Sequence, residues 1–283
     1  MLNVLVAIAH YYKADPHSEH GYGRDTPERR AAIVSDCLRA LLANFAVGRE
    51  HVIQVARSDG SLAFENRPAD EEHAIRMDIA ICTTTGDEHV LPLLDVPETC
   101  YRHVKVSLEN PRNLGYGALQ YLQMNRGRYD YYCYMEDDGL IHDPAFFWKL
   151  AWFESLFGPD AVLLPHRYTL SASAQKVYTD PELHDAFITP WMDFASRPRL
   201  SAPLGGRVMQ FEKPHNPHAG AFFLSSAQFE RFCEREENFT PTPEFISPLE
   251  SAATLGLMKT FDVYKPAFSQ ASFFEMEHHG ARL

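Results

Sequence analysis

Residues 131–138 read YYCYMEDD, a run of aromatic and apolar side chains followed by three consecutive acids. Such a run predicts a strand that is buried on both faces. Adjacent carboxylates repel one another, and a helix N-terminus or a divalent cation is what usually makes such a cluster stable at the end of a strand. The stretch therefore predicts a metal site at the edge of a sheet. The alternative is a solvated turn that caps a helix beginning at Asp143.

Apolar runs and helical patterns alternate ahead of this strand. Leu2–Ala9 is almost continuously apolar, which predicts another strand covered on both faces. Thr26 and Pro27 then open a helix toward Phe45, with a cap residue and a proline at its first position. Further strands are predicted at 51–56, 77–83 and 101–106, and a helix at 116–124. This order predicts an α/β fold with a mainly parallel central sheet flanked by helices, whose ligand lies beyond the carboxyl ends of the strands.

The second half of the chain is less regular. It predicts strands at 161–164, 219–224 and 260–264, with helices that begin at Asp143, at Ser225 or Ser226, and at Ser247. Residues 169–217 are rich in Pro, Ser and Asp and show little periodicity. A stretch of this length in a compact domain is either a functional loop or a set of short elements that the pattern does not resolve.

Charge and composition exclude some classes of protein. The chain of 283 residues has 26 Lys and Arg against 38 Asp and Glu, a formal charge of −12, which disfavours binding to a nucleic-acid backbone. Its five cysteines are widely spaced, which predicts buried thiols in a reducing compartment. The N-terminus has no basic region ahead of its apolar run, and no stretch approaches the roughly 20 apolar residues of a membrane span. These features predict a cytoplasmic protein without a transmembrane segment, and they leave peripheral membrane contact open.

The strand that ends in Glu136, Asp137 and Asp138 resembles the DXD motif of GT-A fold glycosyltransferases, with Glu in place of the first Asp. The resemblance implies that Asp138 binds Mn²⁺ or Mg²⁺ at the diphosphate of a nucleotide sugar. It also implies that Glu136 assists near the metal or the ribose and that Asp137 contributes to nucleotide binding. Carboxylate oxygens suit both cations.

The C-terminal residues Glu277, His278 and His279 form a second group of potential ligands. Imidazole and carboxylate together are a common ligand set for Mn²⁺. Because many GT-A enzymes supply a late histidine to the same metal, the resemblance nominates His278, with His279 as runner-up. Adjacent side chains in an extended segment face opposite ways, so one of the two histidines is expected to bind. The alternative is a polar tail.

Glu250 follows Ser247 by three residues, which is the spacing of a capping box at a helix N-terminus. The functional alternative comes from the resemblance, since inverting GT-A enzymes commonly place an acid at the start of a late helix. That acid removes the proton of the acceptor hydroxyl, a role that we assign to Glu250, with Glu244 as the competing base. In the family a glycine-bearing strand comes before this helix, and the strand with Gly220 resembles it.

Nucleotide-binding residues are nominated by their places in the resembling fold. Arg112 and Asn113 lie in a loop ahead of a helix, where exposed backbone N–H groups can meet phosphate. His10 and Tyr11 follow the first strand, and Asp59 lies in a turn, at positions where such folds hold base and ribose. The alternative for the Arg112 loop is a turn that simply requires glycine.

The resemblance covers nearly the whole chain as an order of elements. It implies one GT-A-like domain over 1–283, with a nucleotide-binding half at 1–138 and an acceptor-binding half at 139–283. The implied activity is glycosyl transfer of the hexosyltransferase type, from a nucleotide-sugar donor to a glycan or lipid-linked acceptor. Two other classes stay open. A metal-dependent nucleotidyltransferase or hydrolase would need a second carboxylate cluster for a second metal, and in a non-catalytic carbohydrate-binding protein the acids would only cap a helix.

Overall fold

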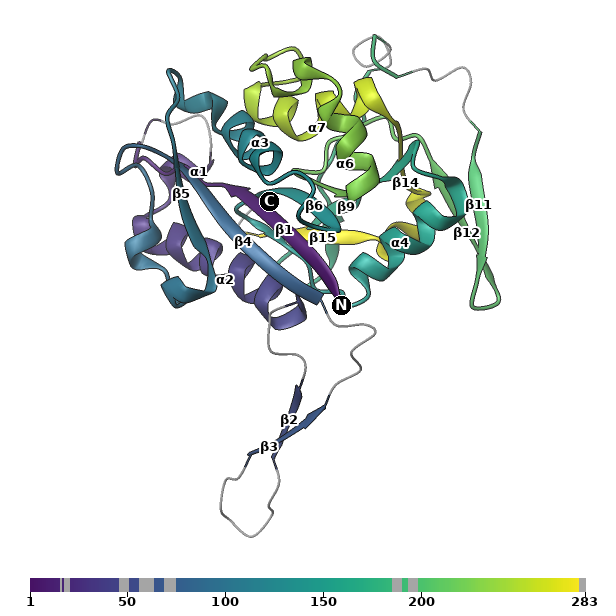
Figure 1. Ribbon diagram of the computed structural model, residues 1–283, viewed down its shortest axis with the longest axis horizontal. Coiled ribbons are helices and arrows are strands. Elements are labelled where there is room, and N and C mark those ends of the chain that lie inside the picture. The colour runs from purple at the N-terminus through teal and green to yellow at the C-terminus, as the bar shows by residue number, and fades with distance from the viewer. Residues whose placement is uncertain are drawn as a thin grey trace.

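The central sheet has five strands in the order β13-β6-β1-β4-β5 (Figure 1). Neighbouring strands run parallel except at the edge, where β13 is antiparallel to β6. The predicted α/β class with a mainly parallel sheet is therefore confirmed. The strands are β1 (Leu2–Ala9), β4 (Ile75–Thr84), β5 (Arg102–Val106), β6 (Tyr131–Glu136) and β13 (Ala221–Ser225). The computed structural model describes residues 1–15, 17, 21–45, 51–55, 64–68, 75–184, 190–192 and 198–279.

Helices cover both faces of this sheet because side chains alternate along each strand. Val4, Val6 and Ile8 of β1 pack in one core with α2 and α4. Leu5 and Ala7 point to the other face and pack with α3, α6 and α7. Continuous burial of β1 thus explains its continuous apolar run. The helices are α1 (Gly21–Arg24), α2 (Pro27–Phe45), α3 (Leu114–Met124), α4 (Phe146–Phe157), α6 (Ser226–Cys233) and α7 (Pro248–Thr260).

The predicted helix starts are close to those observed. Pro27 begins α2, and Ser225 caps α6 through a capping box with Gln228. The helix expected from Asp143 begins three residues later, because the Asp143 carboxylate accepts the N–H of Ala145 and holds a turn before α4. Short 3₁₀ turns connect several elements: η2 (Leu91–Leu93), η3 (Glu98–Cys100), η4 (Pro111–Asn113), η5 (Glu236–Phe239) and η6 (Phe268–Phe273).

Two four-stranded sheets lie beside the central one, in the orders β10-β9-β15-β7 and β11-β12-β14-β8. They resolve much of the stretch 169–217, which contains short antiparallel strands that we did not predict. They also place the C-terminal strand β15 between β9 and β7. The strands are β7 (Gly139–Leu140), β8 (Ala161–Leu163), β9 (His166–Leu170), β10 (Lys176–Tyr178), β11 (Leu200–Leu204), β12 (Arg207–Glu212), β14 (Asp262–Pro266) and β15 (Glu275–His278).

The strand predicted at 51–56 forms as β2 (His51–Val55), but it is not part of the central sheet. It pairs with β3 (Phe64–Pro68) in a separate antiparallel hairpin. This hairpin extends away from the central sheet (Figure 1). The expectation that every early strand joins one sheet was therefore wrong for this segment.

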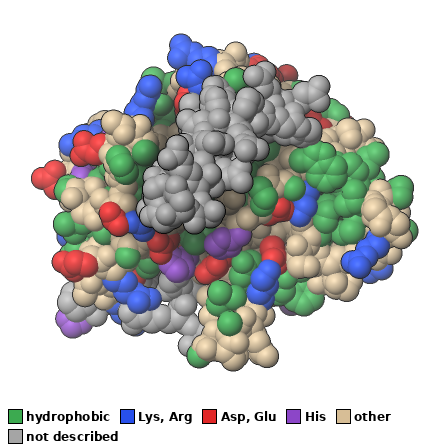
Figure 2. Space-filling view, turned by 90° about the horizontal axis from the view of Figure 1, so that it is seen from below, with side chains coloured by type: hydrophobic (Ala, Val, Ile, Leu, Met, Phe, Trp, Pro, Cys, Tyr) green, Lys and Arg blue, Asp and Glu red, His purple; other side chains and the backbone are tan. Residues whose placement is uncertain are grey.

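The surface mixes charge and apolar side chains. On the face seen in Figure 2, histidine, acidic and basic side chains lie next to one another near the centre, and hydrophobic side chains gather on one flank. The five cysteines are unpaired, and all except Cys100 are buried, as predicted. None of the helices in the described ranges combines the length and the apolar character that a bilayer crossing requires.

Candidate functional site

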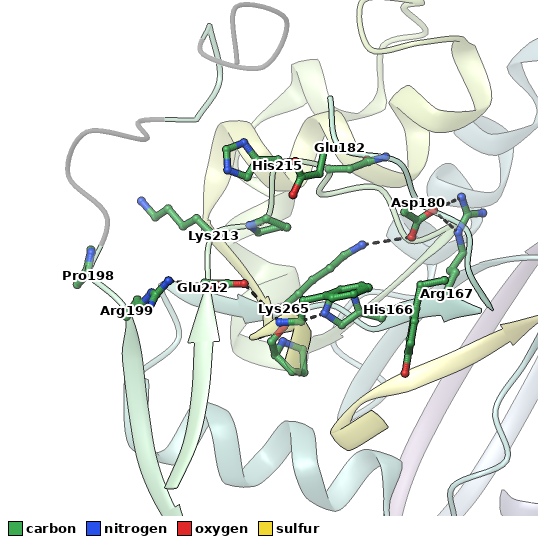
Figure 3. Close-up of a pocket in the computed structure, with 15 residues that line it drawn as sticks. His166, Arg167, Asp180, Glu182, Pro198, Arg199, Glu212, Lys213, His215 and Lys265 are labelled. Atoms are coloured by element: carbon green, nitrogen blue, oxygen red, sulfur yellow. Dashed lines mark hydrogen bonds and ion pairs between the residues drawn. The ribbon is translucent and has the colours of Figure 1, made fainter. Parts of the chain in front are cut away.

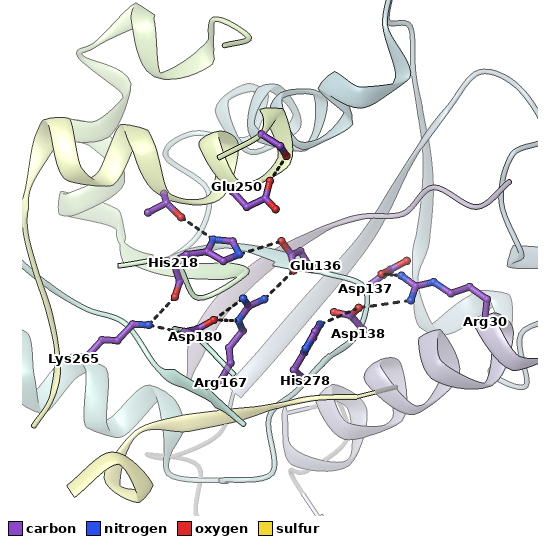
Figure 4. A network of polar contacts seen from close by, with 12 residues as sticks. Arg30, Glu136, Asp137, Asp138, Arg167, Asp180, His218, Glu250, Lys265 and His278 are labelled. Atoms are coloured by element: carbon purple, nitrogen blue, oxygen red, sulfur yellow. Dashed lines mark hydrogen bonds and ion pairs between the residues drawn. The ribbon is translucent and has the colours of Figure 1, made fainter. Parts of the chain in front are cut away.

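The acidic turn lies at the carboxyl edge of the central sheet. Glu136 is the last residue of β6 and pairs with Ala9 at the end of β1. The turn that holds Asp137 and Asp138 therefore follows beyond the carboxyl ends of two parallel strands, which is where α/β sheets bind ligands. The three acids have different sets of partners, and Arg30 is shared by Asp137 and Asp138, with its Nη1 3.6 Å from Asp138 Oδ2 (Figure 4).

Asp137 is held inside the protein by two other elements. It is 4% exposed; one carboxylate oxygen accepts from the guanidinium of Arg30 on α2 and the other from Nδ1 of His10, at 2.5 Å. His10 is fully buried, and its Nε2 accepts the N–H of Val90 at 3.1 Å. Since Nε2 is an acceptor, Nδ1 carries the proton and donates it to Asp137. These contacts fix the acidic turn to β1 and α2, and a nucleotide-binding role for His10 or Asp137 stays a prediction.

Asp138 and His278 lie side by side although they are far apart in the sequence. Asp138 Oδ2 is 3.5 Å from His278 Nε2. The antiparallel pairing of β15 with β7 sets His278 opposite Gly139, and the N–H of His279 donates to the Asp138 carbonyl. The His279 ring turns instead to Asp36, with Nε2 and Oδ2 3.2 Å apart. Of the two nominated histidines, His278 is the one beside the acidic turn.

The electrostatics of this pair favour a charged carboxylate. Burial would raise the pKa of Asp138, but the hydrogen bond and charge of His278, with the charges of Arg30 and Arg167, outweigh burial and hold that pKa well below its usual range. Burial lowers the pKa of His278, and the contact with Asp138 outweighs it, so the net direction is upward. A cation held by Asp138 and His278 would require a neutral imidazole, since metal ligands must be deprotonated.

Glu136 has other partners. Its Oε2 accepts from Arg167 Nη1 at 3.3 Å, and its Oε1 lies 3.7 Å from His218 Nε2. Burial raises the pKa of Glu136 to about 7, against the opposing charge of Arg167. His218 is anchored by Thr254 of α7, with 3.0 Å between Nδ1 and Oγ1, and burial lowers its pKa, which keeps the ring neutral.

Gly220 makes room for the Glu136 carboxylate. Its φ of +60° lies in the left-handed region that favours glycine. A Cβ at this position would lie 2.6 Å from Glu136 Oε2 and 3.0 Å from Arg167 Nη1. The Gly220 carbonyl also accepts the N–H of Glu136 at 2.8 Å. The glycine directly before β13 is thus required by both the backbone conformation and the close approach.

Glu250 lies in the first turn of α7. The cap residue Ser247 accepts the N–H of Leu249 and donates its hydroxyl proton to the Glu250 carboxylate. Ser247 therefore caps the helix, but the predicted capping box does not form, because the Ser247 N–H donates to the Phe245 carbonyl and the Glu250 carboxylate accepts from the Ser247 hydroxyl instead. Figure 4 shows Glu250 next to His218 and on the same side of Glu136. Its charge contributes to the raised pKa of Glu136.

The competing base candidate, Glu244, has a different setting. Its side chain is 54% exposed and lies 3.5 Å from Lys259. The geometry therefore favours Glu250 over Glu244 as the acid that faces the cluster.

The nominated nucleotide-binding residues occupy the predicted elements. Arg112 is exposed in η4, and Asn113 is the cap position of α3. The turn η4 contacts α7, so it lies near the helix that carries Glu250. Tyr11 is partly buried directly after β1. Asp59 lies outside the described residues.

The residues present fit a divalent cation as a partial ligand set. Within the described ranges, no group of three or more His, Cys, Asp and Glu side chains is arranged to hold an ion. Asp138 and His278 nevertheless supply an oxygen and a nitrogen side by side, and Nδ1 of His278 is buried without a hydrogen-bond partner in the same described part of the chain. Mg²⁺ commonly takes one or two protein carboxylates and completes its shell with water and substrate phosphate. Asp138 and His278 suit this mode of cation binding. The Glu136 carboxylate is directed instead to Arg167 and His218.

A buried ion network that we did not predict supports the acids. Arg167 joins Glu136 to Asp180, whose Oδ1 accepts from Nη2 at 2.6 Å. Lys265 is 1% exposed, donates to the His218 carbonyl at 2.6 Å and lies 3.4 Å from Asp180. Charges this deep persist because each is paired and hydrogen-bonded.

The sequence does contain a signal for two buried cations, Arg30 and Lys265. Arg30 shares the apolar face of α2 with Val34, Cys37 and Leu41, and Lys265 lies in the otherwise buried strand β14. A charge at a core position predicts a buried partner. The pattern does not say which carboxylate that partner is.

Comparison with known proteins finds likeness only among solved structures. No family model and no curated protein matches the sequence. TarS 1–349 of S. aureus in complex with UDP has a TM-score of 0.48 at 9% identity, over 98% of this chain and 60% of that chain. Mannose-1-phosphate geranyltransferase from Thermus thermophilus has a TM-score of 0.43 at 11% identity, over 94% and 74% of the two chains.

A third structure, CMP:2-keto-3-deoxy-manno-octonic acid synthetase complexed with CTP, has a TM-score of 0.40 at 12% identity, over 99% of this chain and 92% of that chain. The chain thus spans 60% of the TarS chain that it resembles. With identities of 9 to 12% and TM-scores below 0.5, these likenesses carry no inference about activity.

Proposed function

We propose that the chain is a metal-dependent glycosyltransferase that moves a sugar from a nucleotide-diphosphate donor to a glycan or lipid-linked acceptor. The observation that carries the proposal is the contact between Asp138 and His278 beyond the carboxyl ends of the parallel strands, with Glu250 facing the same cluster. A carboxylate, an imidazole and a second carboxylate at this edge suit the transfer of a group from a diphosphate.

On the donor side, Asp138 and His278 would hold Mn²⁺ or Mg²⁺. The cation would neutralise negative charge on the departing diphosphate. Arg30 and His10 fix the turn that presents Asp138, through their contacts with Asp137. Arg112 and Asn113 are proposed to bind the nucleotide at the start of α3, where the positive end of the helix dipole favours anions.

On the acceptor side, Glu250 is the proposed general base. If the transfer inverts the anomeric carbon, Glu250 takes the proton of the acceptor hydroxyl while that oxygen bonds to the carbon and the carbon–phosphate oxygen bond breaks. Glu250 lies in the first turn of α7. The Ser247 hydroxyl orients it.

Isothermal titration of UDP, GDP and CMP, with and without Mn²⁺, tests the proposal on the wild-type chain and on Asp138→Asn. The expected result is nucleotide binding that requires Mn²⁺ and is lost in the variant. Asp36→Asn is the matched control, because Asp36 contacts His279 and lies beside the same C-terminal strand. Absence of metal-dependent binding by the wild type would overturn the proposal.

A second assay separates glycosyl transfer from nucleotidyl transfer. The chain is incubated with UDP-glucose or GDP-mannose in one series, and with UTP or GTP plus the sugar 1-phosphate in the other. Release of nucleoside diphosphate in the first series supports the proposal. Release of pyrophosphate in the second assigns the chain to the nucleotidyltransferases instead.

A further inference from the structure

A pocket of about 530 Å³ is shown in Figure 3. It opens beside Glu136, Asp137 and Asp138, which together form the acidic cluster, because its lining residue Arg167 contacts Glu136. Its walls come from the start of β9, the end of β10, the end of β12 and the loop that follows it, and the end of β14. Ligand pockets for small molecules have volumes of this order. The pocket is distinct from the proposed metal pair, because neither Asp138 nor His278 lines it.

Arg167 connects the pocket to the acidic cluster. It lines the pocket and contacts Asp180 there, while its Nη1 reaches Glu136 at 3.3 Å. Lys265 and Asp180 complete the pocket floor, and Lys265 donates to the carbonyl of His218, whose ring faces Glu136. A molecule on this floor therefore lies one side chain away from Glu136.

The Lys and Arg residues of the pocket are all paired with carboxylates. Each of its four Lys and Arg residues has a carboxylate within 4 Å: Arg167 and Lys265 share Asp180, Arg199 is 3.6 Å from Glu212, and Lys213 is 2.6 Å from Asp262. A polyanion would have to compete with these existing pairs. A neutral ligand whose groups both donate and accept hydrogen bonds suits a wall of alternating cations and carboxylates, and sugar hydroxyls are such groups.

One wall of the pocket presents an aromatic ring. Phe268 is 64% exposed although it lines the pocket. Its ring is held by edge contacts with Tyr178 and His166, at centroid distances of 5.3 and 5.9 Å, and its N–H donates to Glu212. The C–H face of a sugar ring packs on an aromatic face of this kind and removes both from water. Because neighbouring rings already fix its position, little ordering is needed on binding.

We infer that this pocket is the acceptor subsite and that it binds a neutral saccharide unit, with Phe268 under the sugar ring and Arg199 and Glu212 at its hydroxyls. The inference deepens the proposed function and rests on it. Arg167 then lies between the bound saccharide and the carboxylates of Glu136 and Glu250.

Saturation-transfer-difference NMR tests the inference on the full chain. The probes are the methyl glycosides of glucose, galactose, mannose and N-acetylglucosamine, and the disaccharides cellobiose, lactose and chitobiose. At least one probe is expected to bind through its ring protons. Phe268→Ala should weaken that binding about fivefold, and Glu212→Gln should weaken it by a similar factor through loss of a charged acceptor. Val208→Ala is the matched control, an exposed apolar side chain of β12 that does not line the pocket.

The possible results test the saccharide-binding inference and the proposed function separately. Absence of binding by every saccharide, or equal binding by wild type and Phe268→Ala, overturns the inference. Competition by pyrophosphate that removes the saccharide signal and depends on Arg199 identifies an anion site and also overturns it. Saccharide binding together with metal-dependent nucleotide binding supports the acceptor subsite. Saccharide binding without nucleotide binding overturns the acceptor role and, separately, the proposed function.

Discussion

Asp137 is the most buried of the three adjacent acids, with a side chain 6% exposed against 15% for Glu136 and 19% for Asp138. Its removal leaves the Arg30 guanidinium and the His10 N–H without their carboxylate. Asp137→Asn should therefore lower the free energy of unfolding by about 3 kcal/mol, as expected when one partner of a buried ion pair is lost. Urea denaturation measures this change. Asp36→Asn, with a side chain 41% exposed, should change stability by less than about 1 kcal/mol; equal losses in both variants would contradict the assignment.

Gly220→Ala adds a methyl group where the Glu136 carboxylate lies. We expect a loss of at least about 2 kcal/mol, from the positive φ and from the contact at 2.6 Å. Gly205→Ala is a matched control, since Gly205 has a similar φ of +54° and no described atom within 4 Å of the added Cβ. The difference between the two urea midpoints isolates the cost of the contact. If both variants lose the same stability, the close approach to Glu136 has no energetic consequence.

His166 makes stability depend on pH in the acid range. Burial and the nearby charge of Lys265 lower the pKa of His166 to about 4. Between this value and the ordinary 6.5, the unfolded chain binds a proton that the folded chain does not, so stability rises with pH across this window and is lost as pH falls through it. From pH 7 to 4.5 the wild type should lose about 1 to 2 kcal/mol more than His166→Gln. Parallel profiles in urea denaturation would refute this.

Some residues of the site follow from the sequence and others do not. We predicted one metal site from Asp138, which belongs to the acidic motif, and His278, which is a suitable type of ligand. The structure sets these two residues side by side. His218 and Asp180 carried no such signal, because neither belongs to a sequence motif that indicates its partner, Glu136 or Arg167. Contacts of this kind depend on how sheets pack.

At the scale of elements, the start of α7 joins stability to the proposed chemistry. Ser247→Ala removes the helix cap and should cost about 1 kcal/mol. It also frees the Glu250 carboxylate, so turnover of the donor should fall. Ser225→Ala removes the cap of α6 and should cost a similar amount without this loss of turnover. Urea denaturation and nucleoside diphosphate release measure the two effects, and equal turnover in both variants would argue against Glu250 as the base.

Strands that are buried on both faces were predicted well, because their sequences are continuously apolar. Short strands of mixed polar and apolar sequence were not. β15 reads EMEH, with Met276 as its buried residue, and β11 contains Pro203. Such segments become strands because a neighbour supplies the hydrogen bonds, a tertiary effect that overrides local propensity.

At the scale of the whole molecule, the proposed site draws on both halves of the chain. A cation and nucleotide that bind only the folded protein should raise its melting temperature. At a concentration 100 times the dissociation constant the gain is about 2.7 kcal/mol, or about 5 °C for a chain of this size. Differential scanning fluorimetry with Mn²⁺ and the nucleotide identified by titration measures it, and EDTA should reverse it. His278→Ala should abolish the metal-dependent part, and His279→Ala should retain it.

The α/β class was predictable because the hydrophobic pattern alternates between strand and helix over the first half. The division into one central and two smaller sheets was not, since local patterns do not specify which strands pair. The β2–β3 hairpin illustrates this, because its first strand was predicted and its partner was not.

β15 is inserted between β9 and β7, and this position also affects the proposed metal site. Local fraying of this one segment would withdraw His278 while the central sheet remains intact, since β15 belongs to a different sheet. The proposed activity and global folding would then be separable quantities, and a preparation with a normal far-ultraviolet spectrum could still lack that activity.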